Sequence, residues 1–257
     1  MTATYTLVTG ASSGIGLAFA TEFAQQKHNL ILVARREHIL QKIAQELETK
    51  DVSVEVVPAD LAATGGAEAL FREVESRGLQ VDILVNNAGR GNTSKFCEQN
   101  VQHMRGTQEL NMISLTLLSR LFISKMEANG YGRVINVAST AAFMPAPGFA
   151  VYHASKAYVL SLSEALNIEL KGTGVSVTAS CPGLTESEFH VHADFVNVKG
   201  FDKIPQMPAR QVAQEAYAAM MAGRSLVLHG YLNKALATLP KLIPRRWVPY
   251  LVKAYLT

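Results

Sequence analysis

The sequence lacks most of the features that mark secreted, metal-binding and membrane-spanning proteins. Its 257 residues include only two cysteines, and no Cys and His residues have the spacing of zinc ligands, which argues against a disulfide framework and against a metal site. No apolar run reaches the roughly 18 residues that a membrane-spanning helix needs. The chain enters an apolar run almost at once, without a basic segment before it, so we expect no secretory signal. These absences favour a cytoplasmic protein in which Cys97 and Cys181 are both buried as small apolar side chains.

Acidic residues are missing from the last part of the sequence. Glu215 is the last of them, and the six basic residues after it give this part a charge of +6, whereas the whole chain carries only +3. So small a net charge does not indicate nucleic acid binding. The tail, residues 230–257, adds many apolar residues and three prolines that should divide it into short helical pieces. Such a tail fits a cap over the substrate entrance or a subunit contact, which we favour, or a weak contact with an anionic membrane surface.

Segments typical of strands and of helices alternate along the chain. This alternation predicts a parallel sheet with helices on both faces, because continuous apolar runs such as Asn29–Ala34 suit strands buried on both sides. Strands are expected at Thr4–Thr9, Asn29–Ala34, Val52–Val57, Val81–Asn86, Gly132–Ser139, Gly174–Cys181 and Arg224–Leu228. Helices are expected at Ile15–Gln26, Glu37–Thr49, Gly65–Arg77, Gly106–Asn129, Gly148–Lys171 and Ala209–Ala222. We therefore expect one α/β domain: a Rossmann-type doubly wound sheet of about seven strands in residues 1–229, and a helical extension of the same domain in residues 230–257.

A glycine-rich turn follows the first expected strand. Gly10, Gly14 and Gly16 have the spacing G-x-x-x-G-x-G, at the place where a pyrophosphate would meet the N-terminus of the next helix. Asp60-Leu61 follows the third strand, and Asn86-Asn87-Ala88-Gly89 ends the fourth. These three motifs, in this order, resemble the short-chain dehydrogenase/reductase family over most of the chain. The resemblance implies that a dinucleotide is bound by Gly10, Ser12, Ser13, Gly14, Ile15, Gly16, Asp60, Leu61, Asn87, Ala88 and Gly89.

The end of the second strand indicates which dinucleotide is bound. An acidic residue there would accept a hydrogen bond from the ribose 2′-hydroxyl of NAD and would repel a 2′-phosphate. This chain has Arg35 and Arg36 instead, and two guanidiniums can pair with a phosphate dianion. Hydroxyl groups of Ser12 and Ser13 can add donors. The sequence therefore predicts NADP(H).

Tyr152 and Lys156 lie four residues apart and should project from one face of a helix. A free tyrosine titrates near pH 10, too high for a base at neutral pH, and a nearby ammonium lowers that pKa. Ser139 stands at the end of the fifth strand, where open α/β sheets bind their ligands, and Asn111 lies in the preceding long helix. In identity, order and approximate spacing these four residues match the family's catalytic tetrad.

The resemblance implies a role for each of them. Tyr152 gives a proton to a carbonyl oxygen, or takes one from an alcohol, while Ser139 holds that oxygen. Lys156 lowers the tyrosine pKa and binds the nicotinamide ribose, and Asn111 holds a water that relays protons from Lys156. The segment after the sixth strand should meet the nicotinamide carboxamide, at Pro182, Gly183, Thr185 and Ser187. His153 should have no chemical role, because helix geometry turns it about 100° away from Tyr152.

The substrate site is expected among the residues that follow Ser139 and Gly183. Its apolar candidates are Ala141, Ala142, Phe143, Met144, Pro145, Phe149, Phe189 and Phe195, which either line a pocket for a hydrophobic substrate or pack a lid onto the core. The sequence thus favours an NADP(H)-linked oxidoreductase acting on a carbonyl/alcohol pair of a small molecule. The alternative is a non-catalytic NADP(H)-binding sensor or scaffold. The resemblance also implies a homodimer or homotetramer built on the two long helices.

Overall fold

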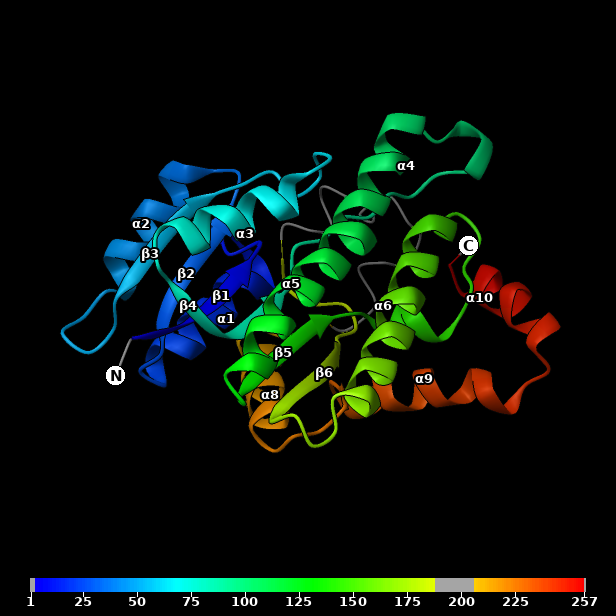
Figure 1. Ribbon diagram of the computed structural model, residues 1–257. Helices are drawn as coiled ribbons and strands as arrows, with labels where there is room; N and C mark the ends of the chain where they lie inside the picture. The colour runs from blue at the N-terminus through cyan, green and yellow to red at the C-terminus, as the bar shows by residue number, and fades with distance from the viewer. Residues whose placement is uncertain (1–2, 188–205, 257) are drawn as a thin grey trace.

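A computed structural model describes residues 3–187 and 206–256. Its centre is one seven-stranded sheet in the order β3-β2-β1-β4-β5-β6-β7, and every neighbouring pair is parallel (Figure 1). The strands are β1 (Thr4–Thr9), β2 (Asn29–Ala34), β3 (Val54–Pro58), β4 (Gln80–Asn86), β5 (Gly132–Val137), β6 (Val175–Cys181) and β7 (Leu226–Leu228). The strand order reverses between β1 and β4, so the carboxyl ends of these two strands form the switch point at which such sheets bind ligands.

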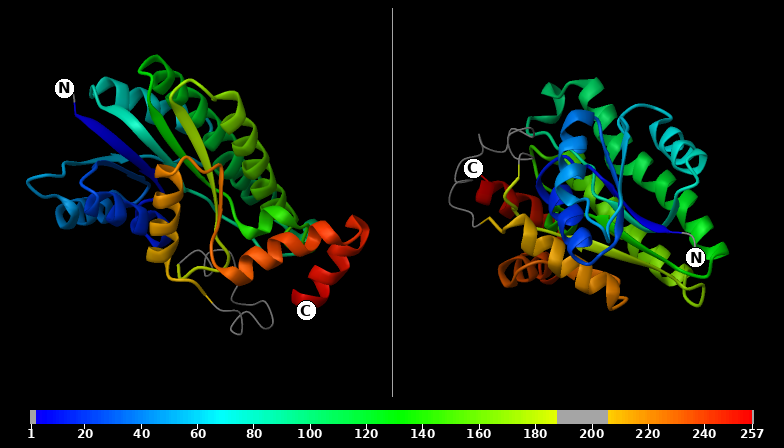
Figure 2. Two further views of the ribbon diagram at one scale, coloured as in Figure 1. Left: turned by 90° about the horizontal axis from the view of Figure 1, so that it is seen from below. Right: turned by 90° about the vertical axis from the view of Figure 1, so that its left-hand side faces the viewer.

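Helices cover both faces of the sheet (Figure 2). One face carries α1 (Gly14–Gln25), α2 (Glu37–Leu47) and α8 (Ala209–Met221), and the other carries α3 (Gly66–Ser76), α5 (Leu115–Ala128) and α6 (Ala150–Glu169). Successive residues of β2 alternate between the two cores: Leu30 and Leu32 pack below α1 and α2, and Ile31 and Val33 pack toward α3. This alternation explains why the strand is apolar at every inner position. The predicted fold class is confirmed.

The long helix expected at Gly106–Asn129 is interrupted. It begins earlier, as α4 (Val101–Gln108), passes through a π-helical segment η2 (Glu109–Ser114), and continues as α5. Apolar periodicity does not distinguish one wide turn from an α-helical turn, so the sequence could not show this change. Asn111 lies inside the π-helical segment, and such segments are frequent at functional sites.

The tail forms short helical pieces, but of its three prolines only Pro244 lies between two of them. These are α9 (Tyr231–Leu242), the 3-10 turn η6 (Arg245–Trp247) and α10 (Val248–Leu256). Pro240 does not end α9 but lies in its last turn, where the missing N–H removes only one hydrogen bond. In the tail, α9 contacts the 3-10 segment η3 (Thr140–Phe143) that follows β5. Within the described part of the chain, no helix combines the length and the apolar character needed to cross a membrane.

Candidate active site

A cavity of about 820 Å³ opens at the carboxyl ends of the parallel strands. Its wall contains every cofactor-binding residue expected from the sequence and three of the four expected catalytic residues, Ser139, Tyr152 and Lys156. The fourth, Asn111, is buried behind the wall. The fold thus brings together motifs that lie more than 170 residues apart in the sequence, from Gly10 to Ser187.

The glycine-rich turn between β1 and α1 is tightly enclosed. Gly10 and Gly14 have φ angles of +68° and +55°, and a Cβ on Gly16 would lie 2.1 Å from the carbonyl oxygen of Gly10. The side chain of Asn87 holds this turn from β4, because its Nδ2 donates to Thr9 O at 2.9 Å. The backbone can therefore approach a ligand closely, and the N-terminus of α1 points to where a phosphate would lie. These are the features that a dinucleotide pyrophosphate requires.

Three arginines line the cavity, two of them directly after β2. Arg36 is half-buried and donates a hydrogen bond from Nη2 to Ser12 Oγ at 3.1 Å, while Arg35 is exposed. Arg90 also lines the cavity; burial lowers its pKa, and so does the neighbouring charge of Arg35, against the opposing effect of Asp60. The sequence interpretation missed Arg90, although its place directly after the motif that ends β4 could have indicated it.

The catalytic candidates on α6 are held in a poorly hydrated environment. Lys156 Nζ donates to the carbonyl oxygen of Val137 at 2.8 Å and lies 5.9 Å from the centre of the Tyr152 ring. Burial lowers the pKa of Lys156 to about 8. Burial also raises the pKa of Tyr152 to about 12, although a hydrogen bond with Ser139 lowers it.

The lowered tyrosine pKa expected from the sequence is therefore wrong for this structure. The ammonium of Lys156 is turned to a backbone carbonyl, and loss of hydration outweighs the nearby hydroxyl of Ser139. Tyr152 is consequently a neutral phenol at physiological pH. A neutral phenol is a proton donor, the form that a carbonyl reduction needs.

Ser139 joins the end of β5 to the segment after β6. Its Oγ accepts a hydrogen bond from Ala141 N at 3.1 Å, which caps η3, and donates to Pro182 O at 3.4 Å. Together with the bond to Tyr152, these contacts fix the hydroxyl at the cavity wall. The geometry places two hydroxyl groups where one substrate oxygen could contact both.

The side-chain amide of Asn111 forms its hydrogen bonds with other residues of the protein. Its Oδ1 accepts from Arg90 N at 2.9 Å, and its Nδ2 donates to Arg90 O at 2.9 Å and to Ser155 Oγ at 3.0 Å. A Cβ on Gly89 would lie 3.3 Å from this amide and 3.5 Å from Lys156 Nζ, so the two side chains meet over this glycine. Asn111 thus fixes the strand end against α6, and its water relay stays a prediction.

The neighbours of these residues explain two further expectations. His153 forms a 2.7 Å hydrogen bond through Nδ1 with Met144 O, and burial lowers its pKa, which fits a packed residue without a role in proton transfer. Cys181 is buried as expected. The expectation for Cys97 is wrong, because it lies in the surface turn η1 (Phe96–Glu98) and is exposed.

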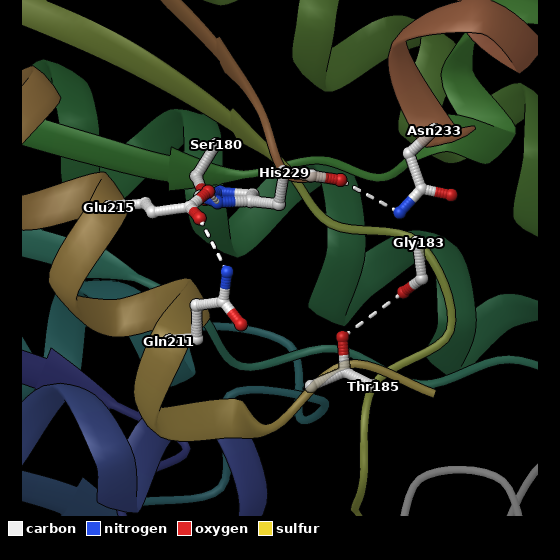
Figure 3. A network of polar contacts seen from close by, with 7 residues as sticks. All are labelled: Ser180, Gly183, Thr185, Gln211, Glu215, His229 and Asn233. Atoms are coloured by element: carbon white, nitrogen blue, oxygen red, sulfur yellow. Dashed lines mark hydrogen bonds and ion pairs between the residues drawn. The ribbon is translucent and has the colours of Figure 1, made fainter. Parts of the chain in front are cut away.

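A polar network ties the segment after β6 to the tail (Figure 3). Buried His229, which follows β7, contacts Ser180 Oγ through Nε2 and Glu215 Oε2 through Nδ1, both at 2.9 Å. Its carbonyl oxygen accepts from Asn233 Nδ2 at 2.8 Å, and the Asn233 side chain lies so close to Gly183 that a Cβ there would be 2.4 Å away. Sequence reasoning missed this network, because its members are scattered over three elements and carry no motif.

The tail closes one side of the cavity. Leu236, Leu239, Pro240, Ile243, Val248, Leu251 and Val252 line it. The tail therefore packs over the cavity, as in one of the two interpretations favoured from the sequence, the cap and the subunit contact.

The apolar residues expected in the substrate site divide between pocket and core. Ala141, Met144 and Phe149 line the cavity, whereas Ala142 and Phe143 pack against the core. Pro145 is not among the lining residues. Phe189 and Phe195 lie outside the described residues.

Residues 4–194 match the short chain dehydrogenase family. The chain belongs to this family. An uncharacterised oxidoreductase from Staphylococcus epidermidis is 34% identical over 189 residues, which are 74% of this chain and 81% of that protein. A short-chain dehydrogenase from Sphingobium yanoikuyae, solved in complex with NADPH, has a TM-score of 0.81 and 30% identity, and the match covers 94% of this chain and 96% of that one.

Another family member was solved with the other nicotinamide cofactor. A 3-ketoacyl-(acyl-carrier-protein) reductase from Brucella melitensis, complexed with NADH, has a TM-score of 0.77 and 28% identity over 87% of this chain and 94% of that one. Short-chain dehydrogenases bind a nicotinamide dinucleotide at the switch point, and the choice between NADP(H) and NAD(H) depends on local residues.

Proposed function

We propose that this protein is an NADP(H)-dependent oxidoreductase that interconverts a carbonyl and an alcohol on an apolar small molecule. The observation that carries the proposal is the placement of the Tyr152 hydroxyl, hydrogen-bonded to Ser139 at the wall of the cavity, with Lys156 buried one helical turn further on. A protein that only sensed NADP(H) would not need this proton donor.

The residues of the site fit a dinucleotide and supply the proton chemistry. Bound nicotinamide would supply the hydride. The phenol of Tyr152 gives its proton to the substrate oxygen as this oxygen gains charge, and the Ser139 hydroxyl donates a hydrogen bond to the same oxygen. The ammonium of Lys156 stabilises the phenolate that remains, since opposite charges attract strongly where water is excluded. In the opposite direction the phenolate takes the alcohol proton.

The arginines beyond β2 support NADP(H) over NAD(H). Arg36 is already oriented by Ser12, and Arg35 adds positive charge next to it, with no acidic side chain at the end of β2. A 2′-phosphate would be attracted there and would gain hydrogen bonds. The NADPH found in the Sphingobium yanoikuyae relative agrees with this choice, whereas the Brucella melitensis relative was solved with NADH.

The substrate end of the cavity is apolar. Tail residues such as Leu236 and Ile243 face Met144 and Phe149 across it, so a hydrophobic ketone or aldehyde would bury its apolar surface there. We infer reduction as the direction wherever the compartment keeps NADP(H) in its reduced form. A cytoplasmic location stays a prediction.

The experiment is NADPH consumption with a panel of hydrophobic ketones and aldehydes. The wild-type protein should turn over at least one of them, and Tyr152→Phe should lower kcat by about 10²- to 10⁴-fold, the usual effect of losing a general acid. NADPH affinity should be retained in this variant, which separates loss of chemistry from loss of folding. Unchanged turnover in Tyr152→Phe would exclude the mechanism, and NADPH binding without turnover of any compound would favour the sensor.

We also propose that the protein is a homodimer or homotetramer built on the long helices. Apolar side chains on their surfaces, Tyr158 and Ile168 of α6 and Ile113 of η2, are exposed in the single chain. Light scattering would test this, because a monomer at micromolar concentration contradicts it.

A further inference from the structure

The C-terminal helices expose much of the apolar surface of this protein. Among the described residues, fourteen large apolar side chains are exposed, and seven of them belong to the tail. These seven are Tyr231, Leu232, Leu239, Leu242, Trp247, Tyr250 and Leu251. Together with the exposed basic residues between them they form a surface that we call the outer tail surface.

The geometry of α9 explains why this surface is separate from the cap. Positions Asn233, Leu236, Pro240 and Ile243 line the cavity. Positions Leu232, Ala235, Leu239 and Leu242 repeat the same spacing one residue earlier, and all four are exposed. One residue corresponds to a rotation of about 100° on a helix. The helix therefore presents two stripes: Leu236, Pro240 and Ile243 close the pocket, Leu232, Ala235 and Leu242 face solvent, and Leu239 lies at the rim between them.

The charges on the outer tail surface all have one sign. The exposed basic side chains that the structure describes there are Lys234, Arg245, Arg246 and Lys253, and the sequence contains no acidic residue after Glu215. Two of these cations lie over aromatic rings: Lys234 Nζ is 5.1 Å from the Tyr231 centroid, and the guanidinium carbon of Arg246 is 5.8 Å from Trp247. Leucine, tryptophan and tyrosine interspersed with lysine and arginine are typical of helices that lie in the headgroup region of a membrane.

A second copy of the chain is a poorer partner for this surface. In a symmetric dimer the same patch meets itself, so the four basic residues of one copy would face the four of the other. Like charges brought together in a contact oppose it strongly. An anionic lipid surface instead attracts every one of them and accepts the apolar side chains between the headgroups.

We propose that the outer tail surface binds anionic phospholipid membranes, with α9 and α10 lying in the plane of the headgroups. Leu239 and Leu251 are each 53% exposed and also line the cavity, so the rim of the pocket is part of this surface. An apolar compound dissolved in the bilayer would therefore meet the pocket mouth directly. That last consequence depends on the proposed reductase function, whereas membrane binding does not.

Trp247 gives a direct assay, since it is the only tryptophan of the chain and is 53% exposed. The full-length protein is mixed with vesicles of phosphatidylcholine alone or of phosphatidylcholine with phosphatidylglycerol, and tryptophan emission and co-sedimentation are measured. We expect a blue shift of the emission and pelleting with the anionic vesicles, both falling as salt is raised. Unchanged emission and no pelleting with anionic vesicles would overturn the proposal.

Charge and apolar variants test the two parts of the surface separately. Arg245→Gln/Arg246→Gln should weaken binding to anionic vesicles by about 30-fold, which corresponds to about 1 kcal/mol for each arginine. The matched control Lys42→Gln/Arg72→Gln removes two exposed charges from α2 and α3 and should bind as the wild type does. Equal losses in both pairs would show attraction by net charge alone and would also overturn the proposal.

The variant Leu242→Ser/Tyr250→Ser removes two exposed side chains that do not line the cavity. It should abolish the blue shift while NADPH binding remains. Sedimentation without lipid compares the oligomeric state of the wild type and of this variant. If the wild type is an oligomer that dissociates in the variant, the surface binds a second copy of the chain and the membrane proposal is refuted.

Discussion

The preference for NADP(H) can be tested by removing the two arginines after β2, one at a time and together. Arg36 is half-buried and oriented by Ser12, so its contact with a phosphate would be a charge-assisted hydrogen bond worth about 1.5–3 kcal/mol. Arg36→Ala should therefore raise the Kd of NADPH by about 10- to 150-fold. Arg35 is exposed, and pairs of exposed charges contribute about 0.2–1 kcal/mol, so Arg35→Ala should raise it by only about 1.5- to 5-fold.

Isothermal titration with NADPH and with NADH measures both effects in one protein. NADH has no 2′-phosphate, so its Kd should stay the same in every variant, and the double variant should have lost most of the preference. Arg72→Ala, an exposed arginine on α3 outside the cavity, serves as the control. If the double variant kept the wild-type ratio of the two Kd values, these arginines would not read the 2′-phosphate and the cofactor assignment would fail.

Two further predictions concern buried ionisable groups. Burial lowers the pKa of Lys156 from its usual 10.5 to about 8. Between these two pH values the unfolded chain binds more protons at this lysine than the folded chain does. The charged lysine therefore lowers the stability of the folded state by its full amount below pH 8, and this loss disappears as the pH rises toward 10.5. Lys156→Met should thus be more stable than the wild type at pH 7, by about 1–3 kcal/mol in urea unfolding, while activity is lost; a less stable variant would contradict this. His229→Leu should leave the buried Ser180 hydroxyl without its partner, which should reduce the free energy of unfolding by about 2 kcal/mol and the Tm by about 4–8 °C. The control His38→Leu, on the exposed side of α2, should change the Tm little. Equal Tm values for the two variants would refute the structural role of the network. Burial also lowers the pKa of His229, so the folded state resists protonation of this side chain. Stability should therefore decrease as the pH falls below about 6.5, and His229→Leu should lose this part of the pH dependence.

Most of the fold could be predicted from the sequence, because the strands and the glycine-rich turn are determined by residues that are close together in the chain. Apolar runs such as Asn29–Ala34 must be buried on both faces, and the observed β2 has the same bounds. The turn after β1 requires its glycines locally, because Gly10 and Gly14 have positive φ angles and Gly16 lies against the carbonyl of Gly10, so their spacing was informative by itself. The motif residues also stand next to strand ends, which a parallel sheet gathers at one edge.

The remaining features depend on contacts between distant segments. The π-helical turn around Asn111 follows from its bonds to Arg90 and Ser155, which lie 21 and 44 residues away. The high pKa of Tyr152 follows from burial that only the assembled cavity creates. The network of His229 and the two stripes of α9 likewise appear only when the tail is placed against the body.

The cap has an evolutionary consequence. The family match ends at residue 194, before α8, β7 and the tail, whereas the glycine-rich turn and the hydroxyls proposed as catalytic all precede that point. The residues of α9 and α10 that line the cavity are therefore encoded by a short terminal stretch that can change while the glycine-rich turn and the other motifs stay the same, provided that the contact of Asn233 with Gly183 is kept. Selection can alter what such an enzyme accepts by rewriting one end of its gene, and a chimera that carries a relative's last helices would repeat that step in the laboratory.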